Sequence, residues 1–162
     1  MSQGGVLNSS SSLGAQPGFS AYSNATLSNV TGDSTLYTVI FNSVAYQSAA
    51  GLYNPITGVF TAPVTGLYSF TYTLSLANLD ATTNDGCVLQ LVTSTRTYRN
   101  VLNNPQSIIY GAPAQFMSLG GSAIAYMTAG DTAYVVLGFF GNPTKNVTIE
   151  DLFTTFSGCR VG

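Results

Sequence analysis

Few side chains in this sequence could carry chemistry. The chain of 162 residues contains no histidine, so a serine nucleophile would lack the base that usually activates it. Paired carboxylates, as in glycosidases, would have to come from acidic residues that mostly occupy turn sequences, where aspartate serves the backbone. These residues are Asp33, Asp80, Asp85, Asp131, Glu150 and Asp151. The sequence therefore predicts a protein that is not an enzyme.

One predicted loop has the oxygen ligands that calcium prefers. Asp80 and Asp85 lie there beside Asn78 and Asn84, and hard oxygen donors this close in sequence suit Ca²⁺. The alternative is an ordinary polar loop. Zinc is disfavoured, because the chain has neither histidine nor a Cys-x-x-Cys pair. We expect no cofactor, with calcium at this loop as the one exception to test.

A second candidate site lies in a predicted hairpin. Arg96 and Arg99 flank Tyr98, and cations beside an aromatic ring suit contact with an acidic sugar or an acidic protein surface. The alternative is a pair of solvated hairpin charges. The candidate ligand-binding residues are thus Asp80, Asn84, Asp85, Arg96, Tyr98 and Arg99.

The segment that must position these loops is a long strand. From Tyr68 to Leu76 every second residue is apolar and the residues between are Ser or Thr, which is the period of a strand that buries one face. Pro63-Val-Thr-Gly66 predicts a turn directly before it. We assign its aromatic residues, with three from later strands, to the core or to a seam between subunits. These residues are Tyr68, Phe70, Tyr72, Tyr126, Tyr134 and Phe139.

The rest of the chain reads as strands separated by turn residues. Counting them gives about ten strands and no helix, at the spacing typical of sandwiches and barrels; two of these strands cover residues 35–41 and 107–110. Residues 42–50 show no pattern, and Gly120-Gly121 interrupts a strand over 115–127, as at a bulge, a bend or a close backbone approach. Residues 1–17 are small and polar and predict a flexible leader. Residues 18–162 predict one domain.

Composition limits the partners. Only 6% of the residues are charged and the net charge is −2, which argues against nucleic acid. The longest apolar run, Ala133–Leu137, is too short to insert in a membrane, and the first residues lack the features of a secretory signal. With so little charge to guard its edges, the chain is expected to bury surface between subunits. Cys87 and Cys159 could pair, or could act as small buried apolar residues.

The segment from Tyr53 to Tyr72 resembles the central signature of the C1q/tumour-necrosis-factor-like domain family. In that signature an aromatic closes a turn, Phe precedes a Pro-containing turn, and Gly-x-Tyr-x-Phe opens the long inner strand; here these are Tyr53, Phe60 and Gly66-Leu-Tyr-Ser-Phe70. Two weaker matches to the family are Ala129-Gly-Asp131, before the penultimate strand, and Phe156-Ser-Gly158, in the last strand. The tail Cys159-Arg-Val161 differs, because the family has apolar residues there. The resemblance implies an all-β, ten-stranded jelly-roll β-sandwich that forms a homotrimer.

The resemblance extends to proteins of microbial and viral surfaces, which the Ser/Thr/Asn-rich, charge-poor composition favours. We therefore expect the trimeric head of a fibre on the surface of a cell, spore or virion, which attaches to a glycan or protein receptor. The alternative is a purely structural trimerisation or capping unit that binds nothing.

Overall fold

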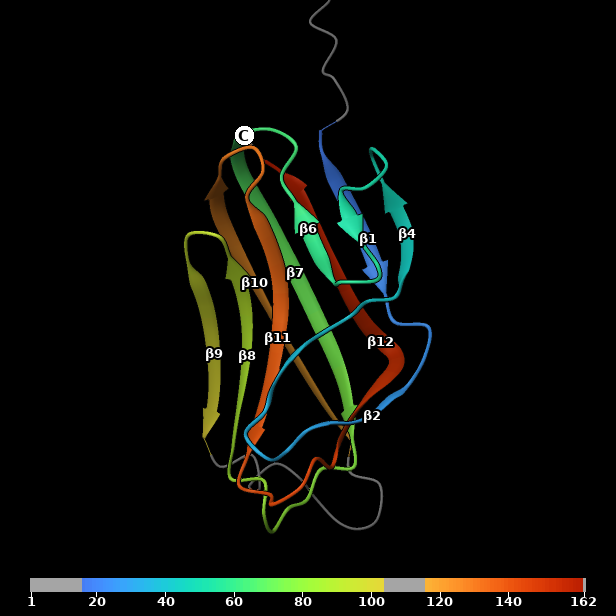
Figure 1. Ribbon diagram of the computed structural model, residues 1–162, viewed down its shortest axis with the longest axis vertical. Coiled ribbons are helices and arrows are strands. Elements are labelled where there is room, and N and C mark those ends of the chain that lie inside the picture. Colours follow the sequence, from blue (N-terminus) through green and yellow to red (C-terminus); the bar gives the residue numbers. More distant parts are fainter. Residues whose placement is uncertain (1–15, 104–115, 162) are drawn as a thin grey trace, which may run out of the picture.

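The computed structural model describes residues 16–103 and 116–161, and these form a sandwich of two antiparallel sheets. Figure 1 shows the sheets stacked face to face, with their strands along the long axis of the molecule. The first sheet has the order β10-β7-β12-β1-β4, with β2 also paired to β12. The second has the order β5-β6-β11-β8-β9, with β3 also paired to β11. The expected all-β jelly roll is confirmed.

The bounds of the strands follow from these pairings. The first sheet contains β1 (Gly18–Tyr22), β2 (Leu27–Thr31), β4 (Ser43–Gln47), β7 (Gly66–Ala77), β10 (Met117–Met127) and β12 (Val147–Arg160). The second contains β3 (Leu36–Thr38), β5 (Tyr53–Asn54), β6 (Val59–Thr61), β8 (Gly86–Thr93), β9 (Thr97–Asn103) and β11 (Thr132–Phe140). None of the described residues forms a helix long and apolar enough to cross a membrane.

The described residues form twelve strands rather than the ten expected. The sequence does not predict β2 and β4, because both are short and most of their side chains are exposed or half-buried, which leaves little hydrophobic alternation. β4 arises inside residues 42–50, and β3 ends at Thr38 rather than Phe41. Between β3 and β4 the chain crosses from one sheet to the other, with Val39 and Phe41 buried on the way. The strand expected over 107–110 and nearly all of the expected leader over 1–17 lie outside the described residues.

The core lies between the sheets and is rich in aromatic rings. β7 alternates as its sequence predicts, with Tyr68, Phe70 and Tyr72 buried and Ser69 and Thr71 facing outward. Rings from the two sheets meet directly: Phe19 of β1 stacks on Tyr53 of β5, with ring centroids 5.1 Å apart. Such contacts stabilise the sandwich beyond the area they bury.

The glycine pair of β10 marks a close approach rather than a bulge. Pairing of β10 with β7 continues without a shift through Gly120 and Gly121. A Cβ on Gly121 would lie 2.6 Å from the Tyr72 hydroxyl oxygen, so only glycine leaves room for that ring. The bulge lies instead in β12, whose register with β7 shifts between Glu150 and Thr155.

Candidate functional site

The six candidate ligand-binding residues occupy two separate places. Asp80, Asn84 and Asp85 lie in the loop between β7 and β8, at the lower end of the sandwich in Figure 1. Arg96 lies at the opposite end of β8, in the turn that leads into β9. The eight residues of β8 separate the two loops by about 26 Å at 3.3 Å per residue. The structure therefore does not bring these residues together in one site.

One carboxylate oxygen of Asp80 takes part in folding its own loop. Its Oδ1 accepts hydrogen bonds from the hydroxyl and the backbone N–H of Thr82, at 2.6 and 2.8 Å. The Thr82 hydroxyl, followed by its backbone N–H, holds the pKa of the Asp80 carboxyl below its usual value of 3.8. The backbone N–H of Asp80 donates to Asn84 Oδ1 at 2.8 Å. This loop thus uses its acidic group as a backbone cap.

A residue from a distant loop, not anticipated from the sequence, completes this network. Asn146 Nδ2 donates to the backbone oxygen of Asn78 at 3.1 Å and to Asn84 Oδ1 at 3.0 Å. Asn84 is fully buried as a result. Within the described residues, no three His, Cys, Asp or Glu side chains gather in a way that could hold a metal. Calcium binding here stays a prediction and would have only Asp80 and Asp85 as charged ligands.

Low pH should weaken the fold through Asp80 and Asp131. The Thr128 hydroxyl, with its backbone N–H, lowers the pKa of Asp131 as Thr82 does for Asp80. A carboxyl whose folded pKa lies below its unfolded value adds stability above that value, and the contribution disappears as the pH falls through the folded pKa. The melting temperature should therefore fall as the pH drops below about 4. A variant with Asp80→Asn and Asp131→Asn should have a lower melting temperature than the unchanged protein near neutral pH. Its melting temperature should also fall less on acidification; an equal fall in the two proteins would contradict this assignment.

The hairpin residues divide between two faces of the second sheet. The Arg96 guanidinium lies over the Tyr98 ring at 5.3 Å, and the Tyr98 hydroxyl donates to the backbone oxygen of Ile124 at 3.1 Å. Tyr98 therefore links β9 to β10 of the other sheet. Arg99, the next residue in the strand, points to the opposite side and faces outward beside Gln90 of β8. Arg96 and Tyr98 therefore contact each other, whereas Arg99 lies on the outer face of the second sheet and is not part of that contact.

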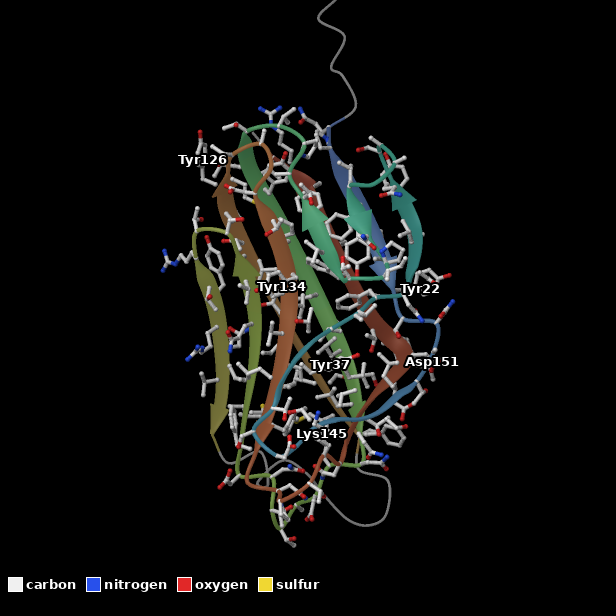
Figure 2. The ribbon with its side chains drawn as sticks, viewed as in Figure 1. Tyr22, Tyr37, Tyr126, Tyr134, Lys145 and Asp151 are labelled. Carbon is white, nitrogen blue, oxygen red and sulfur yellow. The ribbon has the colours of Figure 1, made fainter. Side chains whose placement is uncertain are left out.

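The aromatic residues assigned to the core or subunit seam also separate. Tyr68, Phe70, Tyr72 and Phe139 are fully or almost fully buried within the single chain, so neighbouring copies are not needed to cover them. Tyr126, on the outer face of the first sheet, is 63% exposed. Tyr134 is half-buried on the outer face of the second sheet and so does not share a surface with Tyr126 (Figure 2). Which side of a sheet a ring occupies depends on strand pairing, which the sequence alone does not display.

The outer face of the first sheet has no charged side chain over most of its area. We define the uncharged face as the outward residues of five strands, with the acidic bulge of β12 at its border. They are Leu67, Ser69, Thr71, Thr73 and Ser75 of β7; Ser118, Gly120, Ser122, Ile124 and Tyr126 of β10; Thr155, Ser157 and Cys159 of β12; Ser20 and Tyr22 of β1; and Tyr46 of β4. Ile124 is 60% and Leu67 43% exposed. A single chain thus leaves large apolar side chains in water here.

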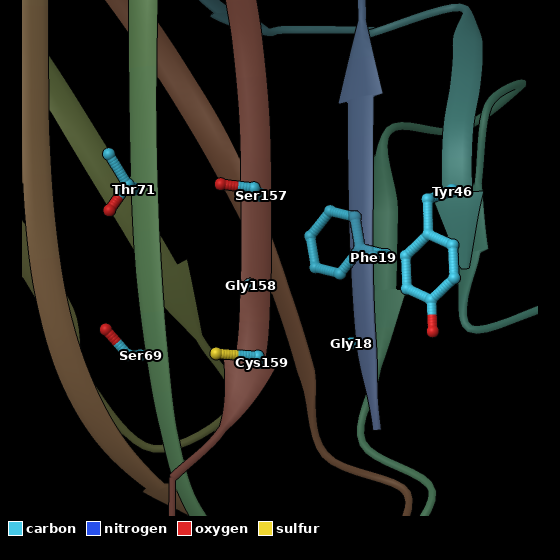
Figure 3. Close-up of a pocket in the computed structure, with 8 residues that line it drawn as sticks. All are labelled: Gly18, Phe19, Tyr46, Ser69, Thr71, Ser157, Gly158 and Cys159. Carbon is cyan, nitrogen blue, oxygen red and sulfur yellow. The ribbon is translucent and has the colours of Figure 1, made fainter. Parts of the chain in front are cut away.

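A shallow depression of about 300 Å³ lies in the uncharged face, across β7, β12 and β1. Figure 3 shows Ser69 and Thr71 on one side, Tyr46 on the other, and Ser157 to Cys159 between them. The absence of a side chain on Gly158 is required by the core, because a Cβ there would lie 2.5 Å from the Phe70 ring. The Phe-Ser-Gly sequence at 156–158 thus places a ring inside and a flat surface outside.

The cysteines are both unpaired and lie in different sheets. Cys87 of β8 is buried, which agrees with its interpretation as a small apolar residue, and burial raises the pKa of its thiol to about 11. Cys159 is exposed on the uncharged face, so that interpretation is wrong for it. The two thiols differ sharply in accessibility.

Comparison with known proteins agrees with this architecture. The globular domain of zebrafish complement 1qA protein matches with a TM-score of 0.57 and 20% identity, over 91% of this chain and 98% of that one. Crystal structures of murine APRIL match with TM-scores of 0.57 at pH 8.0 and 0.56 at pH 5.0, with 15% and 12% identity, each over 90% of this chain and 99% of that one. At these identities the likeness concerns the fold. The sequence model of the C1q domain matches residues 19–159, nearly the whole described sandwich, and the chain belongs to the C1q domain family.

Proposed function

We propose that this chain is a homotrimeric, non-enzymatic head on the surface of a microbial or viral fibre, cell or spore. It holds three chains together and attaches to a glycan or protein receptor. The observation that carries the trimer is the uncharged face, because exposed apolar side chains that are contiguous on a sheet mark an interaction surface. The exposed apolar side chains are adjacent on this face: Leu67 and Tyr126 are direct cross-strand partners, and Ile124 lies beside them, paired with Ser69.

The uncharged face also has a suitable chemistry for contact between copies. Its residues on β7 and β10 extend for about 30 Å, and the shorter stretches on β12, β1 and β4 bring its area to roughly 400 Å², about half the share of one partner in a standard-sized interface. Its hydroxyl groups can form hydrogen bonds across the contact, and no charge has to be removed from water. The C1q-like fold is in keeping with a threefold arrangement, in which closed symmetry satisfies every copy.

Attachment is supported by surface residues that a trimer would repeat three times. Repetition lets weak single contacts combine into useful avidity. Asp85, Arg96 and Arg99 remain the substitutions to test, and the low-charge, hydroxyl-rich composition favours a microbial or viral setting. One observation favours the purely structural alternative: Asp80 and Asn84 are already engaged in stabilising their own loop.

The purified chain should elute as three copies. Size-exclusion chromatography with light scattering at micromolar concentration should give three times the 16.9 kDa of one chain. A stable monomer would contradict the trimer. Binding of the trimer to glycan arrays and whole cells then tests attachment: if neither Asp85→Ala, Arg96→Ala nor Arg99→Ala changes it, the structural alternative replaces the attachment role.

A further inference from the structure

A second hollow lies on the outer face of the other sheet, away from the uncharged face. It is an open hollow of about 350 Å³, within the range of small-ligand sites, and residues of four strands line it. Leu36, Val88, Val101 and Phe140 provide apolar walls, and Gln90, Arg99 and Ser34 provide polar groups. We call this hollow the Arg99 groove. Its position leaves it open to solvent when copies pack through the first sheet.

Gln90 is an unusual residue for this position. It is only 5% exposed, yet its side chain lines the groove. Among the described residues the one buried side-chain polar atom without a hydrogen-bond partner is Arg160 Nε, so the Gln90 amide is not an orphaned group. Gln90 instead gives the groove a polar group among the apolar side chains that line it, where a ligand can form a hydrogen bond with it.

Arg99 supplies a charge at the adjacent position. Gln90 and Arg99 are direct cross-strand partners in β8 and β9, a relation that places their Cβ atoms about 5 Å apart. Arg99 is exposed and forms no ion pair within the part of the chain that the structure describes. A planar guanidinium and an amide N–H side by side match the two oxygen atoms of a carboxylate.

We propose that the Arg99 groove binds a small carboxylic acid with an apolar body, such as an aryl or branched alkyl acid. The carboxylate would accept hydrogen bonds from Arg99 and Gln90, and the body would lie against Val88, Val101 and Phe140. A sugar fits less well, because these apolar walls would leave its hydroxyl groups without partners. The proposal does not rest on the trimer or on receptor attachment, so either can fail without the other.

Binding can be tested with 3-phenylpropionate, followed by amide shifts in heteronuclear NMR. The expected result is saturable binding with the largest shifts at Arg99, Val101 and Phe140. Two ligand controls use the unchanged protein: 3-phenylpropionamide lacks the charge, acetate lacks the body, and each should bind at least about tenfold more weakly. Absence of saturation, or equal binding of the amide, would overturn the proposal.

Matched variants locate the contact. Arg99→Met should weaken binding of 3-phenylpropionate about tenfold or more, and Gln90→Met, which keeps the volume, should weaken it severalfold. Arg96→Met removes the same charge from the same hairpin, outside the groove, and should leave the affinity unchanged. Equal losses in the Arg96 and Arg99 variants would show a general charge effect and refute the site. If one of these variants does not fold, the two ligand controls still test the proposal, because they use the unchanged protein.

Discussion

Replacing Phe156 by alanine should lower the free energy of unfolding by about 3–5 kcal/mol, the usual cost of deleting a buried ring. Phe156 is fully buried in β12 and packs against rings from several parts of the sandwich. Its ring centroid lies 4.9 Å from that of Phe19, 5.4 Å from Phe41 and 6.0 Å from Phe70. Because these rings come from different strands and a crossing segment, they cannot close the cavity together.

Urea unfolding followed by tyrosine fluorescence measures this loss, since the chain has no tryptophan. A total stability of about 5–15 kcal/mol is usual for a domain, so this loss is a large share of it, and the urea concentration at the midpoint of unfolding should fall clearly. Phe153→Ala is the matched control: it removes the same atoms from the same strand, at a ring that is 78% exposed, and should change stability by about 0.5 kcal/mol or less. A loss below about 1 kcal/mol for Phe156→Ala would contradict its central role.

The elements that the sequence predicts well are those whose signal is local. β7 buries every second residue, so its alternation is visible without knowing its partners. The turn at Pro63–Gly66 uses residues that fix their own backbone angles, and it lies directly before that strand. The family resemblance adds the order of the remaining strands, which local patterns do not supply.

The elements that the sequence predicts poorly depend on distant contacts. β2 and β4 are short and mostly exposed or half-buried, so their pairing with β12 and β1 leaves little trace in hydrophobicity. The bulge of β12 is also hidden: Phe153 has a φ of 61°, a conformation that a bulky residue rarely adopts. The backbone oxygen of Glu150 accepts a hydrogen bond from the Thr154 hydroxyl there, a contact across the bulge that no propensity predicts.

The same distinction explains the candidate sites. Residues such as Asp80 and Thr82 interact within a few positions, and loop chemistry predicts that kind of contact. The separation of Asp85 from Arg96 follows from the length and direction of β8, and the pairing of Arg99 with Gln90 follows from register. Both features need the sheet to be assembled before they can be seen. The uncharged face likewise emerges only when five strands are placed side by side.

Thr71→Asp should convert the proposed trimer into monomers. Thr71 is exposed at the middle of the uncharged face, with Ser122 and Ser157 as its cross-strand partners. A carboxylate buried there between copies would find no cation on the face to pair with, and an unpaired buried charge costs about 3–5 kcal/mol. Threefold symmetry repeats that cost in every copy. Light scattering should therefore report the mass of one chain, at concentrations where the unchanged protein is trimeric.

Thr97→Asp separates this effect from a general effect of added charge. It makes the same change at an exposed strand position of β9, on the other sheet, and should leave the trimer intact. The rate of thiol labelling is a second measurement of the same effect. Cys159 lies on the uncharged face, so a thiol reagent should label it slowly in the trimer and rapidly in the Thr71→Asp variant. Cys87 should stay unlabelled in both, because it is buried and its pKa of about 11 keeps the thiol protonated. If the two aspartate variants have the same mass and the same labelling rate, the copies do not associate through this face, whatever their number.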